Sequence, residues 1–86
     1  MRDVKVHDLG HSKATLQVYG REHAPPHFHI VGPGFSVSID MATLSVDGIR
    51  GRPPKNVVAD AIAWASLVEN QKLLQTTWDT LNERIH

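Results

Sequence analysis

The apolar pattern changes its period halfway along the chain of 86 residues. Up to about residue 46, apolar and polar residues alternate in short runs that glycines separate, as over residues 35–39. A period of two is typical of strands with one buried face. From residue 54 onward apolar residues recur at intervals of three and four, which predicts helices with one apolar face. Strands followed by helices predict an α+β fold, in which helices pack on an antiparallel sheet.

We expect a single domain over residues 1–86, because a chain this short already buries only roughly 60–65% of its unfolded surface. Its sheet is predicted to have four to five short strands over about residues 3–46, and its two helices to span about 54–69 and 71–85. Pro53 and Pro54 suit the first turn of a helix, and Asn70 tolerates the backbone conformation that ends one. A single long bent helix is the alternative to a break near Asn70.

The composition excludes several classes of protein. There is no cysteine, so a disulfide framework, a cysteine-based zinc finger and a thiol nucleophile are ruled out. Nine basic and nine acidic residues balance to zero with neutral histidine, which argues against binding nucleic acid through bulk charge. The first ten residues lack the apolar run of a signal peptide, and no stretch of about 18 apolar residues predicts a membrane span. We therefore expect a cytoplasmic protein with no membrane association.

Histidine is the conspicuous residue type. The chain has six, and His23, His27 and His29 lie close together in it. His27 and His29 are two apart on a predicted strand, so their side chains point to the same face. Pro25 and Pro26 stiffen the corner that precedes them and can hold His23 near the pair. Three converging imidazoles suit Zn²⁺ or another divalent transition metal with an open coordination position.

A hairpin between residues 27–31 and 35–40 would bring further polar groups to this face. Registers that keep the apolar sides together place His27 opposite Ser38 or opposite Asp40. Asp40 can then orient a histidine tautomer or add a metal ligand. Without a metal, His27, His29 and Asp40 are candidates for acid–base catalysis on a phosphodiester. The structural alternative is that these histidines are solvated, cap backbone groups or pack on an aromatic ring.

A basic cluster, Arg50, Arg52 and Lys55, surrounds the predicted start of the first helix. A helix N-terminus presents unpaired N–H groups and partial positive charge, so three cations beside it can bind phosphate or carboxylate. The two prolines remove some of these donors, and the alternative is a solvated basic loop. If this loop and the histidines lie on the same side of the molecule, a phosphate-bearing ligand is favoured.

The segment from Glu22 to His29, with its histidine, two prolines and His-Phe-His, resembles the hallmark of a small bacterial family, the domain of unknown function 4160 family. Other features follow in the family's order over about residues 18–82: Gly32, Gly34, Asp40, Gly51, Pro53, Pro54, Lys55, Trp64, Asn70, Leu74 and Trp78. The resemblance implies a small α+β domain, usually a standalone bacterial protein, without an established activity or cofactor. It also implies a place in toxin–antitoxin-like gene pairs.

Two functions follow from these patterns. The first is a protein-interaction module, in a toxin–antitoxin-like pair, that binds a protein partner or associates with itself. Small size, neutral charge, two tryptophans and the edge strands of a small sheet favour it. The alternative is a metal-binding or acid–base phosphodiesterase or nuclease-like enzyme that uses the histidine cluster. Binding of nucleic acid without chemistry is not favoured, because the chain has no basic stripe.

Overall fold

Five strands precede two helices in the computed structural model, which describes residues 3–10, 13–20 and 25–82. The elements are β1 (Asp3–Asp8), β2 (Thr15–Tyr19), β3 (His27–Gly32), β4 (Phe35–Asp40), β5 (Val46–Gly51), α1 (Lys55–Ala65) and α2 (Val68–Leu81). The strands form one antiparallel sheet in sequence order, so β1 and β5 are its edges. The predicted α+β fold is confirmed. None of the helices in the described ranges is long and apolar enough to span a membrane.

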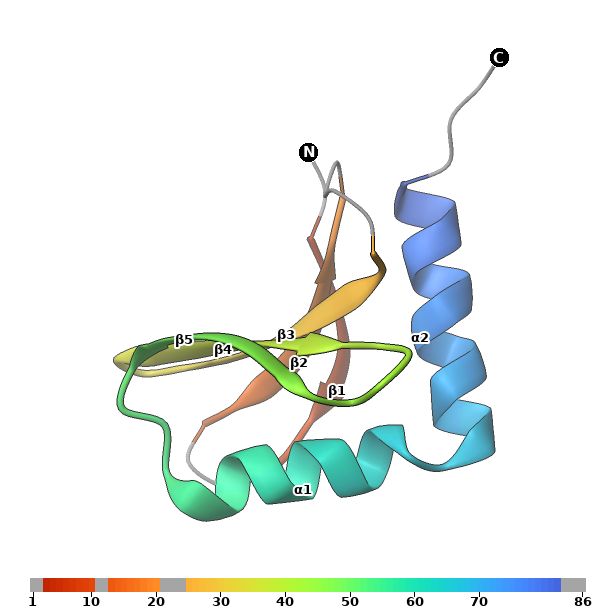
Figure 1. Ribbon diagram of the computed structural model, residues 1–86. Helices are drawn as coiled ribbons and strands as arrows, with labels where there is room; N and C mark the ends of the chain where they lie inside the picture. The colour runs from red at the N-terminus through yellow and green to blue at the C-terminus, as the bar shows by residue number, and fades with distance from the viewer. Residues whose placement is uncertain (1–2, 11–12, 21–24, 83–86) are drawn as a thin grey trace.

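The two helices pack on one face of the sheet (Figure 1). α1 runs beneath the sheet and α2 stands upright beside it, with a sharp corner between them. Every second residue of β2, β3 and β4 is buried, and the residues between are half-buried. The main core side chains are Leu16, Val18, Phe28, Ile30, Phe35, Val37 and Ile39 from the strands and Val57, Ala61, Ala65, Leu74 and Trp78 from the helices. The alternating polar residues therefore form the opposite face of the sheet.

The last strand runs beyond the predicted limit of residue 46. All six residues of β5 are exposed, so it lacks the alternation of buried residues that predicts a strand. It forms because β4 offers its outer side for pairing, with a register shift between Ser38 and Ile39. β5 has a weak apolar pattern because it lies at the edge of the sheet, where neither of its faces is buried.

The break between the helices was predicted near Asn70, and this is wrong. α1 ends at Ala65 and α2 begins at Val68, with Leu67 in an extended conformation between them. Asn70 instead lies in the first turn of α2, where its side-chain amide donates a hydrogen bond of 2.9 Å to the carbonyl of Trp64. The helices thus span 55–65 and 68–81 rather than 54–69 and 71–85, and residues 83–85 lie outside the described residues.

A glycine joint positions the far end of β5. Pro33 and Gly34 connect β3 to β4, and Gly34 has the positive φ of +77° that the third position of a type II turn requires. Phe35 pairs with Gly32 on one side and with Gly51 on the other. Gly51, with φ of +75°, lies so close to this turn that a Cβ there would fall on the Gly34 carbonyl oxygen. The joint therefore holds the end of β5 directly against the β3–β4 turn.

Candidate functional site

The uncovered face of the sheet collects the polar residues that the alternation predicted. His27 pairs with Asp40 and His29 pairs with Ser38, so of the two registers that parity allows, the one with Asp40 opposite His27 is formed. On the next strand Arg50 pairs with Ser36. Directly paired residues of an antiparallel sheet point to the same side. The histidines, the serines, Asp40 and Arg50 therefore share one face.

A hollow of about 460 Å³ crosses this face from β2 to the β5 edge. We call it the open-face hollow, and its lining residues are Tyr19, His29, Ser36, Ser38, Gly48, Ile49 and Arg50. Gly48 has no side chain, and a Cβ built on it would meet nothing within 4 Å. The hollow is therefore open where it reaches β5.

Four aromatic rings form a row that begins in the hollow, with Tyr19 and His29, and leads away from it through His27 to Trp78. Tyr19 stacks on His29 with ring centroids 4.1 Å apart and planes at 16°. His29 meets His27 edge to face at 5.1 Å, and His27 lies 5.2 Å from Trp78 of α2. At the end of α2, the side-chain amide of Asn82 donates a hydrogen bond of 3.2 Å to the carbonyl of Tyr19. Both imidazoles are thus oriented by packing, as aromatic pairs at these separations are.

The backbone orients one ring nitrogen of His27. Its Nδ1 lies 2.9 Å from the carbonyl oxygen of Pro25, and a carbonyl can only accept, so Nδ1 carries the proton. In the neutral imidazole this tautomer leaves Nε2 as the basic nitrogen. The carbonyl of Pro25 therefore holds the proton of His27 at Nδ1, and a role of Asp40 in orienting a histidine stays a prediction.

Asp40 holds the connection between β4 and β5. Its Oδ1 accepts hydrogen bonds from the backbone N–H groups of Ala42 (2.8 Å) and Thr43 (3.0 Å). These backbone hydrogen bonds, from Thr43 first, lower the pKa of Asp40, and the charge of His27 adds a smaller lowering. Asp40 is thus an ionised carboxylate that the backbone of the β4–β5 connection stabilises, on the strand position opposite His27.

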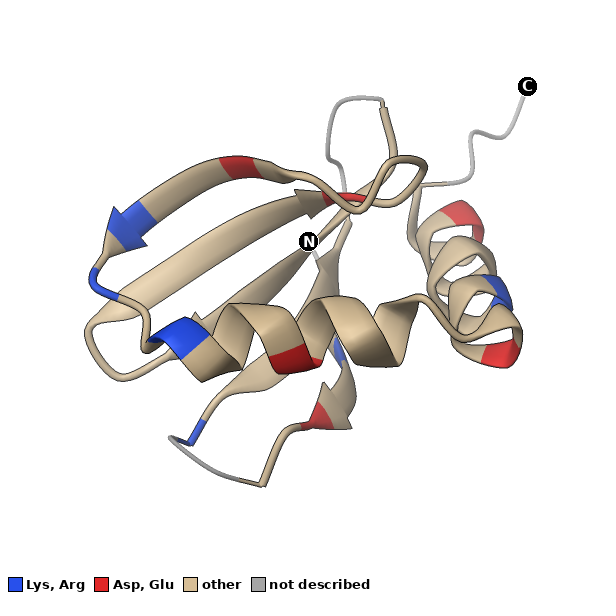
Figure 2. Ribbon diagram, turned by 60° about the horizontal axis from the view of Figure 1, so that its bottom comes forward, with Lys and Arg blue, Asp and Glu red and all other residues tan. Residues whose placement is uncertain are grey.

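The three residues of the predicted basic cluster do not all belong to the hollow. Arg50 lines the open-face hollow, whereas Arg52 and Lys55 are exposed and do not. Figure 2 shows the corresponding basic segments at the end of β5, in the loop after it and at the start of α1. Pro54 is the N-cap of α1 and makes no side-chain hydrogen bond to it. The condition that favoured a phosphate-bearing ligand was that this basic loop lies on the histidine side, and only Arg50 of the three residues is shown to meet it.

The predicted metal set is only partly within the described residues. His27 and His29 are neighbours, but His23 lies outside the described residues. Over residues 3–10, 13–20 and 25–82, no group of three or more His, Asp or Glu side chains is arranged to hold a metal ion. A site for Zn²⁺ or a similar ion therefore remains a prediction that depends on His23.

Sequence reasoning missed Tyr19 as a member of the site. It follows Thr15 and Gln17 on the polar side of β2, and this alternation was the available signal. His7 has a different location. A register shift after Lys5 pairs His7 with Leu16, on the side that the helices cover, and its ring stacks on Trp64 at 4.5 Å. His7 is therefore a packing residue outside the open-face hollow.

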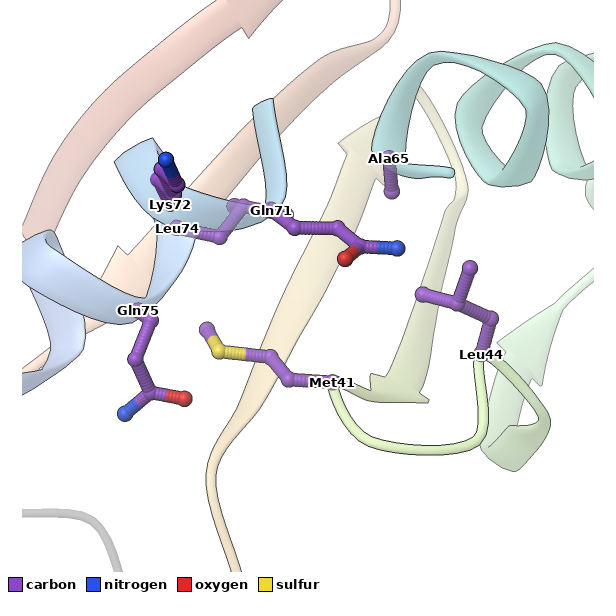
Figure 3. A pocket seen from close by; sticks show the side chains of 7 residues that line it. All are labelled: Met41, Leu44, Ala65, Gln71, Lys72, Leu74 and Gln75. Atoms are coloured by element: carbon purple, nitrogen blue, oxygen red, sulfur yellow. The ribbon is translucent and has the colours of Figure 1, made fainter. Parts of the chain in front are cut away.

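A second hollow, of about 260 Å³, lies at the corner between the helices (Figure 3). Met41 and Leu44, from the β4–β5 connection, face Leu74 of α2 and Ala65 at the end of α1. Gln71, Lys72 and Gln75 complete its lining. We call it the corner hollow. Among the described residues, none of those predicted for catalysis, metal binding or anion binding lines it.

Comparison with known proteins adds no functional assignment: no family model, no curated protein and no solved structure matches the chain. The function is therefore argued from the chemistry of the site.

Proposed function

We propose that the protein binds a phosphate-bearing ligand in the open-face hollow, where His29 of the lining and the adjacent His27 exchange protons with the ligand. The observation that carries this proposal is the presence of Arg50 in the same hollow as His29, Ser36 and Ser38. A guanidinium group gives paired charged donors that match phosphate oxygens, and two hydroxyls and an imidazole add further donors. A volume of about 460 Å³ lies in the range of small-molecule sites, roughly 300–1,000 Å³.

The chemistry that suits this arrangement is cleavage of a ribose phosphodiester. One imidazole removes the proton of the 2′-hydroxyl, whose oxygen attacks phosphorus. The other imidazole donates its proton to the departing 5′-oxygen, so a cyclic phosphate and a free 5′-hydroxyl result. Arg50 would stabilise the charge on the phosphate oxygens in the transition state. Adjacent imidazoles, with ring centroids 5.1 Å apart, support this division of roles.

Binding is tested with inorganic phosphate. The imidazole ¹⁵N signals of His29 are expected to shift during the titration. Arg50→Gln should raise the dissociation constant about ten- to a hundredfold, because hydrogen bonds to charged groups contribute about 1.5–3 kcal/mol. Arg52→Gln is the matched control: it removes the same charge outside the hollow and should change the constant less than twofold. Equal losses in both variants would show that only bulk charge attracts the anion.

Catalysis is tested separately with a short single-stranded RNA. His27→Ala and His29→Ala should each lower the cleavage rate about 10²- to 10⁴-fold, the usual contribution of a positioned acid or base. His7→Gln, on the other face of the sheet, is the control and should keep the rate. Phosphate binding without RNA cleavage in the wild type would leave a binding protein and remove the enzymatic part of the proposal.

A second candidate function, a protein-interaction module, is favoured by the helix corner. Leu67, Val68 and Leu73 are large apolar side chains that are exposed there, and Val68 is 65% exposed. The corner hollow lies between residues 65 and 75 as well, with Met41 and Leu44 opposite. Exposed apolar side chains beside an apolar hollow suit a partner that inserts a side chain.

The partner would be the product of a neighbouring gene in a toxin–antitoxin-like pair, as the resemblance to the domain of unknown function 4160 family implies. Co-expression of the two gene products tests this function. Val68→Glu should abolish co-purification, whereas Val46→Glu, on β5, should retain it. Retention of the complex in Val68→Glu would argue against the helix corner as the interface.

A further inference from the structure

The open-face hollow reaches an edge of the sheet. Gly48, Ile49 and Arg50 belong both to the lining of the hollow and to the edge strand β5. Ile49 is 55% exposed, a large value for an isoleucine in a strand. An edge strand pairs readily with another strand, because its outer backbone groups lack a neighbouring strand. Any strand added to β5 would therefore extend the hollow as well as the sheet.

We infer that two copies of this chain join through their β5 strands, antiparallel and with Ile49 opposite Ile49, so that their open-face hollows merge into one phosphate site with two Arg50 side chains. The phosphate part of this inference rests on the proposed function, whereas the strand pairing does not.

Symmetry restricts the registers of such a pair. A two-fold axis perpendicular to the sheet keeps the polar faces of both copies on one side. Opposite residues must then point to the same face, so one residue of β5 has to lie opposite its own copy. The residues that can take this central position are Gly48, Ile49 and Arg50. Centring on Arg50 places two like charges directly opposite, which is destabilising. Centring on Gly48 places Ile49 opposite Asp47. Centring on Ile49 covers the exposed apolar side chain with its own copy, and is the register that the side chains favour.

In the Ile49-centred register, Arg50 of each copy lies opposite Gly48 of the other. Gly48 has no side chain and the space above it is empty to 4 Å, so the arginine of the second copy can extend over it into the hollow. The two Arg50 residues become diagonal neighbours, about 7–8 Å apart in the backbone. Their like charges repel, and a phosphate between them would offset the repulsion. Each copy thus supplies an arginine to the other's site.

The pairing between the two β5 strands involves few residues, so bound phosphate should decide how much dimer forms. The register shift of β5 leaves Gly48, Ile49 and Arg50 as its regular centre. An interface of this extent belongs below about 1,200 Å², among weak associations. A ligand that binds the dimer more tightly than the monomer raises the apparent dimerisation constant, by up to a factor of one plus the ratio of the ligand concentration to Kd, which is about hundredfold at a hundred times its dissociation constant. We therefore expect a weak dimer that phosphate strengthens.

A single cysteine tests the register. The chain has no cysteine, so Ile49→Cys creates a unique thiol. Opposite residues of an antiparallel pair have Cα atoms about 4.5–5.5 Å apart, within the range of about 4.4–6.8 Å that a disulfide requires. Mild oxidation should therefore crosslink Ile49→Cys at least tenfold faster than Val46→Cys and Leu73→Cys, which replace residues that are each 43% exposed. Equal crosslinking of the three variants, or fastest crosslinking of Val46→Cys, would overturn the inferred register.

Sedimentation of the wild type with and without inorganic phosphate tests the shared site. The dimer fraction should rise with phosphate in the wild type, remain low in Arg50→Gln and be lost in Ile49→Lys, with Leu73→Lys as the matched control. Selective crosslinking of Ile49→Cys without any phosphate effect would support the strand pairing and overturn the shared phosphate site. Phosphate binding to a strict monomer would overturn the dimer and leave the proposed function standing.

Discussion

Gly51→Ala tests whether the glycine joint holds β5, and with it Arg50, in place. The added Cβ would meet two obstacles. The φ of +75° is a left-handed conformation, which costs an L-residue roughly 1–2 kcal/mol. The Cβ would also fall on the Gly34 carbonyl oxygen and lie 3.0 Å from the Cα of Phe35, so backbone must move. Overpacking that moves backbone costs about 1–3 kcal/mol.

Two other glycines separate these contributions. Gly34 has a φ of +77°, but a Cβ there meets nothing within 4 Å, so Gly34→Ala carries only the conformational cost of about 1–2 kcal/mol. Gly48 has neither obstacle, and Gly48→Ala should change the unfolding free energy by less than about 0.5 kcal/mol. Gly51→Ala should lose about 2–5 kcal/mol, the two costs together. From the most to the least stable variant, the expected order is therefore Gly48→Ala, Gly34→Ala and Gly51→Ala.

Thermal unfolding followed by circular dichroism measures this order. For a domain of this size, each 1 kcal/mol lowers Tm by about 4–8 °C. If Gly34→Ala and Gly51→Ala lower Tm equally, the close approach of Gly51 to the turn is not present in solution. Where Gly51→Ala remains folded, its phosphate affinity should fall with that of Arg50→Gln, because Arg50 adjoins the displaced residue.

Three further changes have defined outcomes. The pKa of Asp40 is lowered in the folded state, so its ionised form stabilises the fold above the ordinary pKa of 3.8, and this stabilisation is lost as the pH falls through the lowered pKa. Urea unfolding at pH 7 and at pH 2 measures the effect. The unfolding free energy should fall less between these two pH values in Asp40→Asn than in the wild type. Asn70→Asp cannot donate to the Trp64 carbonyl and should lower the unfolding free energy by about 0.5–1.5 kcal/mol, seen as a lower urea midpoint with an unchanged m-value. Trp78→Ala should cost about 3–5 kcal/mol, since Trp78 is only 7% exposed. In the same variant, the ring signals of His27 should shift because their aromatic neighbour is lost.

The parts of the site on β3 and β4 were predictable. Alternation over residues 35–39 identifies Ser36 and Ser38 as polar-face residues, and the requirement that apolar sides coincide places them with the histidines. The structure confirms this, and it selects Asp40 as the residue opposite His27. These predictions succeed because a strand's side-chain direction alternates as a local property of its backbone.

Two other features could not be predicted, because each depends on a contact outside the segment that forms it. β5 is a strand only because the outer side of β4 was available, and its six exposed residues carry no periodic signal. The helix break lies at Ser66 and Leu67, although Asn70 is the better helix terminator, because Asn70 uses its side chain to cap the Trp64 carbonyl across the corner. Pairing with β4 thus supplied what the pattern of β5 lacked, and at the corner a side-chain hydrogen bond across six residues overrode the propensity of Asn70 to end a helix.

The sequence by itself determined that the protein has an α+β fold and that His27, His29, Ser36 and Ser38 share a face, since both follow from hydrophobic periodicity. Only the tertiary structure decided that Tyr19 stacks on His29 and that Arg50 lies in the same hollow while Arg52 and Lys55 do not. Strand order and register bring these residues together from β2, β3 and β5. Register depends on turns, bulges and the packing of a whole sheet, so no single segment of the chain encodes it.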